Sequence, residues 1–257
     1  MIIDAHAHVH DPVEEHLAKM DAAGVERSVI FGTRAHPERA RDLAELREEM
    51  AVLQRSLGGR RNGAADYRLA YAELDDALAR WPERFIGFGA VPLDGVVDEA
   101  VEREVVGRGL KGIGELTPPP GEAQRLEPVL RAASDHRLPV VVHGFAPTTE
   151  DDLRTLADLA ARHADVPLII SQLGGLHWMT AIELVRDRPN MYLELSTAPI
   201  VFAVRLAISE IPERSLFGSD APYGDPVLAR RTVERVTTPG ELRDRILGGN
   251  LVALLDG

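Results

Sequence analysis

The stretch Ile2-Ile3-Asp4-Ala5-His6-Ala7-His8 begins with an apolar run and ends in two histidines that are separated by one residue. It predicts a strand over residues 2–5, and side-chain alternation along a strand places both imidazoles on one face. At about 3.3 Å per residue their Cα atoms lie about 6.6 Å apart, so both rings can reach one cation at bonds of about 2.0 Å. Asp4 shares this face and could orient one ring. A His-x-His pair equally describes two surface histidines, so residues elsewhere must complete a site.

Short apolar runs alternate with longer amphipathic segments along the whole chain, which is typical of repeated βα units around a parallel sheet. Eight such runs in 257 residues predict one α/β domain over residues 1–257, a closed (β/α)8 TIM barrel. Helical periodicity is clearest over residues 122–135, 150–164 and 181–186. The predicted strands cover residues 2–5, 27–31, 85–90, 110–115, 139–143, 168–172, 191–195 and 216–218.

The interval between the second and third strands, residues 32–84, is longer than one crossover helix needs. It holds two helical patterns, residues 37–57 and 64–79, joined by the glycine-rich residues 58–63. Loops at this end of a barrel strand cover the active site, so we expect a lid or a contact with a second copy of the chain in a homo-oligomer. A surface hairpin of helices is the alternative.

Composition narrows the class of protein. The chain is 45% hydrophobic and 27% charged, as expected for a soluble globular domain. It has no cysteine, which excludes disulfides and thiolate metal sites and suits a cytoplasmic enzyme. The sequence predicts neither a secretion signal nor a membrane span. A net charge of −12 argues against nucleic acid as a partner and leaves a small-molecule substrate as the expected ligand.

Ligand-type side chains follow four of the predicted strands. Catalytic groups of a barrel lie at the carboxyl ends of its strands, so we expect these side chains to meet at one rim. Three imidazoles and two carboxylates suit one or two divalent ions, with Zn²⁺ as the expected metal and one position left for water. The predicted metal ligands are His6, His8, Glu115, His143 and Asp220.

Several of these residues have other interpretations. Asp220 could cap the next helix, although Asp225 beside Pro226 is the better-placed cap. Glu115 could bridge a second metal, bind substrate or pair with Lys111. His143 could be a core histidine.

The remaining histidines lie in helices or in the loops beside them. Four are expected to be solvated, and His10 is expected in a loop just past the first motif. His177 opens the helix after the sixth strand and could serve as a catalytic proton donor or a substrate contact. Trp178 and Tyr223 fall near the same rim and are candidate substrate-binding residues. The four histidines expected to be solvated are His16, His36, His136 and His163.

This arrangement resembles the amidohydrolase superfamily, and within it the amidohydrolase-related group (amidohydrolase 2) of metal-dependent hydrolases and non-oxidative decarboxylases. The resemblance extends over nearly the full chain. It implies that His6, His8, His143 and Asp220 are metal ligands and that Asp220 also shuttles protons. The motifs that carry it are Asp4-Ala5-His6-Ala7-His8, His143, Leu173-Gly174-Gly175, Gly218-Ser219-Asp220-Ala221-Pro222 and Ile246-Leu247-Gly248-Gly249-Asn250.

The chain departs from that family at Gln172, where a histidine usually precedes the Gly-Gly pair. An amide ligates metals more weakly than imidazole and cannot act as a base, so either the site is adapted, with Gln172 facing substrate, or the activity is altered. Gly114-Glu115-Leu116 also resembles the TatD-type deoxyribonucleases, in which an acid on the fourth strand joins a two-metal site. That likeness supports Glu115 as a ligand, while the negative charge of the protein opposes DNA binding.

The leading functional hypothesis is hydrolysis of a small ester, lactone or amide by metal-activated water, with Asp220 carrying the proton. The first alternative is non-oxidative decarboxylation of an aromatic or unsaturated acid, with Asp220 or His177 protonating the carbon that loses CO2. The second is a catalytically silent barrel that binds a ligand or a partner.

Overall fold

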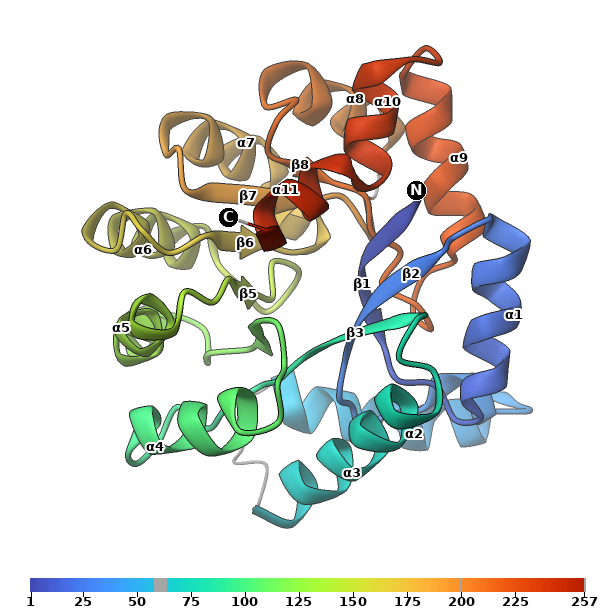
Figure 1. Cartoon of the computed structure of the whole chain (residues 1–257), viewed down its shortest axis with the longest axis vertical. Coiled ribbons are helices and arrows are strands. Elements are labelled where there is room, and N and C mark those ends of the chain that lie inside the picture. The colour runs from blue at the N-terminus through green and yellow to red at the C-terminus, as the bar shows by residue number, and fades with distance from the viewer. Residues whose placement is uncertain (58–63, 199, 257) are drawn as a thin grey trace.

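The structure is a computed structural model that describes residues 1–57, 64–198 and 200–256. Eight strands alternate with helices in the predicted order, and the helices lie outside the strands (Figure 1). The strands are β1 Ile3–His8, β2 Arg27–Phe31, β3 Phe85–Phe88, β4 Ile113–Leu116, β5 Val140–Val142, β6 Leu168–Ile170, β7 Met191–Glu194 and β8 Ser215–Leu216. The larger helices are α1 Val13–Ala23, α2 Leu43–Leu57, α3 Ala64–Arg80, α5 Glu127–His136, α6 Glu150–Arg162, α7 Trp178–Asp187, α8 Val201–Glu210, α9 Pro226–Val236 and α11 Asn250–Asp256. Shorter helical segments are η1 Pro37–Arg39, α4 Val97–Val101, η2 Glu102–Val106, η3 Ala123–Leu126, η4 Gln172–His177, α10 Glu241–Asp244 and η5 Arg245–Gly249.

All paired strands run parallel, and they close into the predicted barrel. One set of strands has the order β1-β2-β3, and the other has the order β4-β5-β6-β7-β8. Within each set, every strand therefore pairs with its neighbours in the sequence. Single bridges between Ala7 and Ala221 and between Gly89 and Ile113 connect the two sets. At the first seam the amide of Ala5 donates to the carbonyl of Phe217 at 2.9 Å. The first and last strands therefore lie side by side, which brings the two ends of the sequence to one site.

Two apolar clusters stabilise this arrangement. One fills the barrel, with Ile3, Phe31 and Phe88 among its members, and Leu251 and Leu254 of α11 close its amino-terminal end. The larger cluster lies between the strands and the surrounding helices. Because the barrel interior is filled at that end, polar side chains can gather only at the carboxyl ends of the strands.

Strand β1 contains a bulge that the alternation argument does not predict. Asp4 pairs with Ser28 and Ala7 with Ile30, so β1 has one more residue than β2 between these pairs. An extra residue in one strand shifts the phase of its side chains. His6 and His8 still share a face, but Asp4 does not share it.

The interval between β2 and β3 forms the two predicted helices, α2 and α3, while the predicted glycine-rich connection lies outside the described residues. The carboxylate of Asp42 accepts hydrogen bonds from the amides of Ala44 and Glu45, which caps the start of α2. In the part of the chain that the structure describes, no helix is long and apolar enough to cross a membrane.

Candidate metal centre

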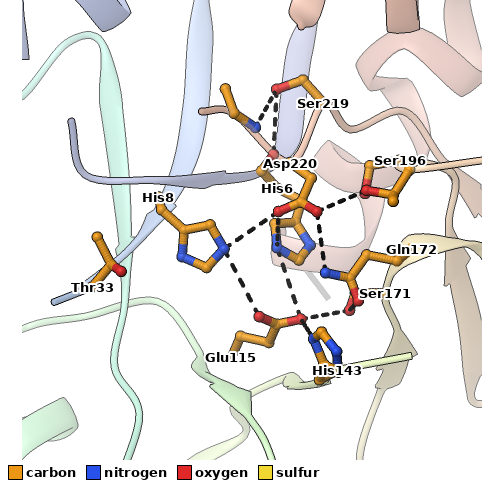
Figure 2. A network of polar contacts seen from close by, with 12 residues as sticks. His6, His8, Thr33, Glu115, His143, Ser171, Gln172, Ser196, Ser219 and Asp220 are labelled. Atoms are coloured by element: carbon orange, nitrogen blue, oxygen red, sulfur yellow. Dashed lines mark hydrogen bonds and ion pairs between the residues drawn. The ribbon is translucent and has the colours of Figure 1, made fainter. Parts of the chain in front are cut away.

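His6 and His8 on β1 meet Asp220, which follows β8, at the carboxyl end of the barrel (Figure 2). Oδ1 of Asp220 lies 3.5 Å from Nε2 of His6 and 3.4 Å from Nε2 of His8. The two rings meet edge to face, with centroids 5.4 Å apart. Two imidazole nitrogens and one carboxylate oxygen thus lie within 4.8 Å of one another, close enough to hold one ion.

Glu115 at the end of β4 faces this group from the opposite side (Figure 2). Its Oε1 lies 3.9 Å from Nε2 of His6, and its Oε2 lies 3.9 Å from Nε2 of His8. Ser171 donates a hydrogen bond to Oε1 of Glu115 at 2.7 Å. Lys111, the alternative partner, is exposed, whereas the Glu115 side chain is buried.

His143 comes directly after β5 and lies beside Glu115. Its Nδ1 is 3.1 Å from Oε1 of Glu115, and its Nε2 is 3.1 Å from the carbonyl oxygen of Ala146. Both ring nitrogens therefore have an oxygen partner, and His143 is outside the group formed by His6, His8 and Asp220.

The centre has the electrostatics of a cation site. Nε2 of His6 and Oδ1 of Asp220 are buried and have no hydrogen-bond partner among the residues that the structure describes. Burial lowers the pKa of His6, but the carboxylates of Glu115, Glu194 and Asp220 outweigh it and raise that pKa to about 10. Burial raises the pKa of Asp220, yet the imidazoles of His8 and His6 hold it below its usual range. Ionised carboxylates and unpartnered nitrogens in a buried pocket fit a divalent ion.

Glu194 at the end of β7 is a site residue that the sequence analysis missed, although its strand also ends in an acid. Its Oε2 lies 3.2 Å from Nδ1 of His6 and accepts hydrogen bonds from the amide of Gln172 and the hydroxyl of Ser196. A Cβ on Gly218 would come within 2.2 Å of this carboxylate, so the glycine leaves room for it. Glu194 therefore contacts the Nδ1 edge of His6, which points away from the centre, and fixes the orientation of the ring.

The prediction that Asp4 orients a histidine ring is wrong. Its buried carboxylate accepts hydrogen bonds from the amide of His6 at 3.0 Å and the amide of Ser219 at 2.9 Å, and also from the Ser219 hydroxyl. The bulge in β1 turns Asp4 toward the chain that follows β8. Burial raises the pKa of Asp4 to about 7, against the lowering effect of the Ser219 contacts. Asp4 thus fixes the chain that carries Asp220.

Gln172 lies in the site, but its amide oxygen faces away from the centre. That oxygen accepts hydrogen bonds from the amides of Gly144 and Phe145, at 3.2 Å and 3.1 Å. Its Nε2 donates to Oδ2 of Asp220 at 3.2 Å, and Thr197 donates to the same oxygen at 2.7 Å. Gln172 and Thr197 therefore hold one oxygen of Asp220 and leave the other facing His6 and His8.

A cavity of about 300 Å³ lies over these residues. His8, Glu115, His143, Gln172 and Asp220 line its floor. Apolar side chains of the barrel and of α2 and α3 form much of its wall, including Phe31, Phe88, Leu116, Leu53, Leu57 and Leu74. The two inserted helices are thus part of the pocket itself.

Three predicted site residues remain, namely Tyr223, His177 and Trp178, and the cavity contains only the first of them. Tyr223 lines it, with its ring 5.5 Å from that of His8 and its hydroxyl oxygen buried. The described residues that line the cavity do not include His177 or Trp178. His177 lies 3.9 Å from Glu150, and Trp178 packs edge to face on Phe202.

The turn after β6 explains why these two side chains are outside. Leu173, Gly174 and Gly175 all have positive φ, between 56° and 72°, which breaks the helical path of η4. The chain therefore leaves the rim before it reaches His177. No pattern in the sequence specifies the direction of this turn.

Three other histidines are more buried than the sequence suggests. His36 is 1% exposed and contacts the carboxylates of Glu38 and Glu73. His10 and His16 are buried and stack on one another with ring centroids 4.3 Å apart. Burial lowers the pKa of His10 to about 4 and places the pKa of His16 well below its ordinary value. The prediction of solvated side chains is wrong for His16 and His36, whereas His136 is exposed and His163 is partly buried.

The amidohydrolase family model (Amidohydro_2) matches residues 3–256. The chain belongs to the amidohydrolase family. This amidohydrolase also resembles solved structures in fold. One of them is the dihydroxybenzoic acid decarboxylase of Polaromonas sp., with bound manganese and the inhibitor 2-nitroresorcinol. The two structures superpose with a TM-score of 0.73 at 16% sequence identity, and the match covers 99% of this chain and 96% of the decarboxylase chain.

Two further structures extend this comparison. The 2,6-dihydroxybenzoate decarboxylase of Rhizobium has a TM-score of 0.70 at 18% identity and covers 100% of this chain and 99% of its own. The 4-oxalomesaconate hydratase of Rhodopseudomonas palustris has a TM-score of 0.65 at 17% identity and covers 100% of this chain and 96% of its own. No protein with a curated description matches the amidohydrolase in sequence.

Proposed function

We propose that this amidohydrolase is a metal-dependent decarboxylase of a small aromatic or unsaturated carboxylic acid. The observation that carries the proposal is the apolar cavity of about 300 Å³ placed directly over His8 and Asp220. A planar ring with one carboxylate fits between the apolar wall and the polar floor. The decarboxylases of similar fold act on acids of this kind, which supports the proposal.

His6, His8 and Asp220 would hold the divalent cation, which supplies electron withdrawal from a carboxylate or hydroxyl oxygen of the substrate when it is bound. Phe31, Phe88 and Leu116 exclude water around the ring. An apolar wall disfavours the charged carboxylate more than the neutral CO2 that leaves.

Asp220 is the residue placed to move the proton, because His177 lies outside the cavity. Gln172 and Thr197 hold its Oδ2, Oδ1 lies beside His6 and His8, and the residue lines the cavity. Asp220 is ionised in the resting site, so it first takes up a proton from solvent and passes it to the ring carbon. The carbon–carbon bond then breaks, its electron pair returns to the ring, and CO2 leaves with no net oxidation or reduction. Tyr223, beside His8, offers its hydroxyl to a polar group of the ring.

The test measures CO2 release from a panel of hydroxybenzoates and carboxyvanillates, using protein loaded with Zn²⁺ or Mn²⁺ in parallel. We expect turnover of at least one acid and a fall of about 100-fold or more in kcat for Asp220→Asn. Trp178→Phe, outside the cavity, is the matched control and should keep wild-type kcat. Absence of CO2 release across the panel, with the metal bound, contradicts the proposal.

Hydrolysis is the second candidate, and one observation favours it. Oδ1 of Asp220 has no hydrogen-bond partner among the described residues and lies beside both imidazoles. A carboxylate there can accept the proton of an attacking water. Turnover of lactones or amides by the same loaded protein, without CO2 release, would assign hydrolysis. Turnover of any substrate excludes the silent barrel.

A further inference from the structure

We infer that the substrate carries an apolar substituent on the side of its ring opposite the carboxylate, and that this group lies against the inserted helices α2 and α3. The inference rests on the proposed function, because it places the reacting carboxylate over the floor that contains His8 and Asp220. It deepens that proposal by naming the class of substrate, an aromatic acid with an alkyl or aryl group.

The cavity is larger than a single aromatic ring requires. An apolar cavity of about 150 Å³ accommodates a molecule of benzene, whereas the cavity over the candidate metal centre has a volume of about 300 Å³. A ring with its carboxylate therefore leaves space for a further group.

The side chains that α2 and α3 contribute to the cavity are mostly apolar. Leu53 and Leu57 of α2 line it, and so do Ala70 and Leu74 of α3. None of these four side chains has a hydrogen-bonding group, so they favour an apolar neighbour over a polar one. Each methylene that moves from water to such a surface strengthens binding by about 4-fold.

Two polar side chains of the same region already have partners in the protein. The hydroxyl of Tyr71 donates a hydrogen bond to the carbonyl of Ala90 at 2.8 Å. Arg34 also lines the cavity, and its guanidinium pairs with the carboxylate of Glu73 at 2.8 Å. Because Glu73 offsets the charge of Arg34, the region does not select for an anionic substituent.

Close contacts with the barrel hold α3 in place as a wall of the cavity. A Cβ on Gly32, which follows β2, would come within 3.0 Å of the carbonyl oxygen of Ala70, so the glycine permits this close approach. Arg108 pairs with Asp75 of α3, and its guanidinium lies 4.5 Å from the ring centre of Tyr71. A wall held by these contacts should limit the length of the substituent.

The first experiment compares 2-hydroxybenzoates that carry hydrogen, butyl or carboxylate at C4, using CO2 release by the Mn²⁺-loaded protein. We expect kcat/KM for the butyl acid to exceed that for the unsubstituted acid by about 10-fold or more. Equal values for these two acids would overturn the inference. A highest value for the dicarboxylate would also overturn it and would assign Arg34 to an anionic group.

Variants of Leu53 test where the substituent lies. Leu53→Trp fills space beside α2 and should lower the ratio of kcat/KM for the butyl acid to that for the unsubstituted acid by about 10-fold or more. Leu53→Ala enlarges the space and should shift the preference from butyl to hexyl. Leu69→Trp is the matched control and should keep the wild-type ratio, because Leu69 is exposed on α3 and is not among the described residues that line the cavity. The unfolding temperature checks that each variant is folded, and a ratio that neither Leu53 variant changes would overturn the inference.

A binding measurement separates failure of this inference from failure of the proposed function. Calorimetry compares phenol with 3-butylphenol, neither of which has a carboxylate to lose. We expect 3-butylphenol to bind about 10-fold or more tightly, with a loss of this difference in Leu53→Trp. That result without CO2 release from any acid supports the inference and counts against the reaction alone. Equal binding of the two phenols, with CO2 release from the unsubstituted acid, overturns the inference and leaves the reaction in place.

Discussion

Glu194 lies behind His6, on the side of the ring that points away from the candidate metal centre, and this position leads to a prediction about a single residue. Glu194→Gln should weaken Zn²⁺ affinity by about 10- to 100-fold, because a neutral amide replaces the carboxylate 3.2 Å from Nδ1 of His6. Chelator competition on the folded variant measures the change. Ser196→Ala, which removes one donor to Glu194 and leaves the contact with His6, should have a smaller effect. Equal affinity in Glu194→Gln and the wild type would show that His6 needs no partner.

Single residues are also where reasoning from the sequence reaches its limit. The search for polar residues at strand ends finds five candidate ligands, His6, His8, Glu115, His143 and Asp220. The structure brings ligand atoms of His6, His8 and Asp220 within 4.8 Å of one another. Glu115 lies 3.9 Å from His6, and His143 lies 3.1 Å from Glu115. The argument cannot find the phase shift at Asp4, which depends on one extra residue in β1 relative to β2. The register between two strands depends on both segments, so it cannot be predicted from the side-chain periodicity of one segment alone.

At the scale of elements, His36 joins the parts of the insertion between β2 and β3 to one another. Its amide donates to Glu49 of α2 at 2.8 Å, and its Nε2 lies 3.2 Å from Glu73 of α3. Its Nδ1 lies 3.1 Å from Glu38, and Arg34 pairs with Glu73 at 2.8 Å. Burial lowers the pKa of His36, but Glu38 and Glu73 outweigh it and raise that pKa to about 9.

This raised pKa predicts that His36 stabilises the fold most at low pH. The stabilisation is complete below the ordinary pKa of 6.5 and is lost as pH rises through about 9. The free energy of unfolding of the wild type minus that of His36→Gln should therefore fall by about 1–3 kcal/mol between about pH 6 and pH 9.5. Urea unfolding of both proteins across this range measures it, and His136→Gln, on an exposed side chain, is the control. A difference that does not change with pH would contradict the charged contact.

Element order is the feature that the sequence predicts best, since every strand and both inserted helices form where the patterns place them. Strand ends are predicted less well. Residues 143, 172 and 218 fall in predicted strands but lie beyond the ladders. The turn from Leu173 to Gly175 likewise removes His177 and Trp178 from the pocket. Positive φ at Leu173 arises from tertiary context, because its side chain has no intrinsic preference for that conformation.

At the scale of the whole molecule, the candidate ligands join distant parts of the chain across the place where the barrel closes. His6 and His8 belong to the first strand and Asp220 follows the last. The seam between them has a single bridge, a few backbone hydrogen bonds and the contacts of Asp4 with Ser219. A cation shared by both strands cross-links this seam. Its removal leaves several buried carboxylates around two imidazoles with no ion between them.

We therefore expect metal to stabilise the barrel as a unit. Zn²⁺ at about 100 times its Kd should add about 2.7 kcal/mol, which for a domain of this size raises Tm by about 5–10 °C. Thermal unfolding with Zn²⁺ and with excess chelator measures the shift, and Asp220→Asn should remove most of it. Hydrogen exchange should slow on metal binding in residues 3–8 and 217–221, the two sides of the seam, more than in β2 and β3. A Tm shift without that local protection would place the ion somewhere other than between His6, His8 and Asp220.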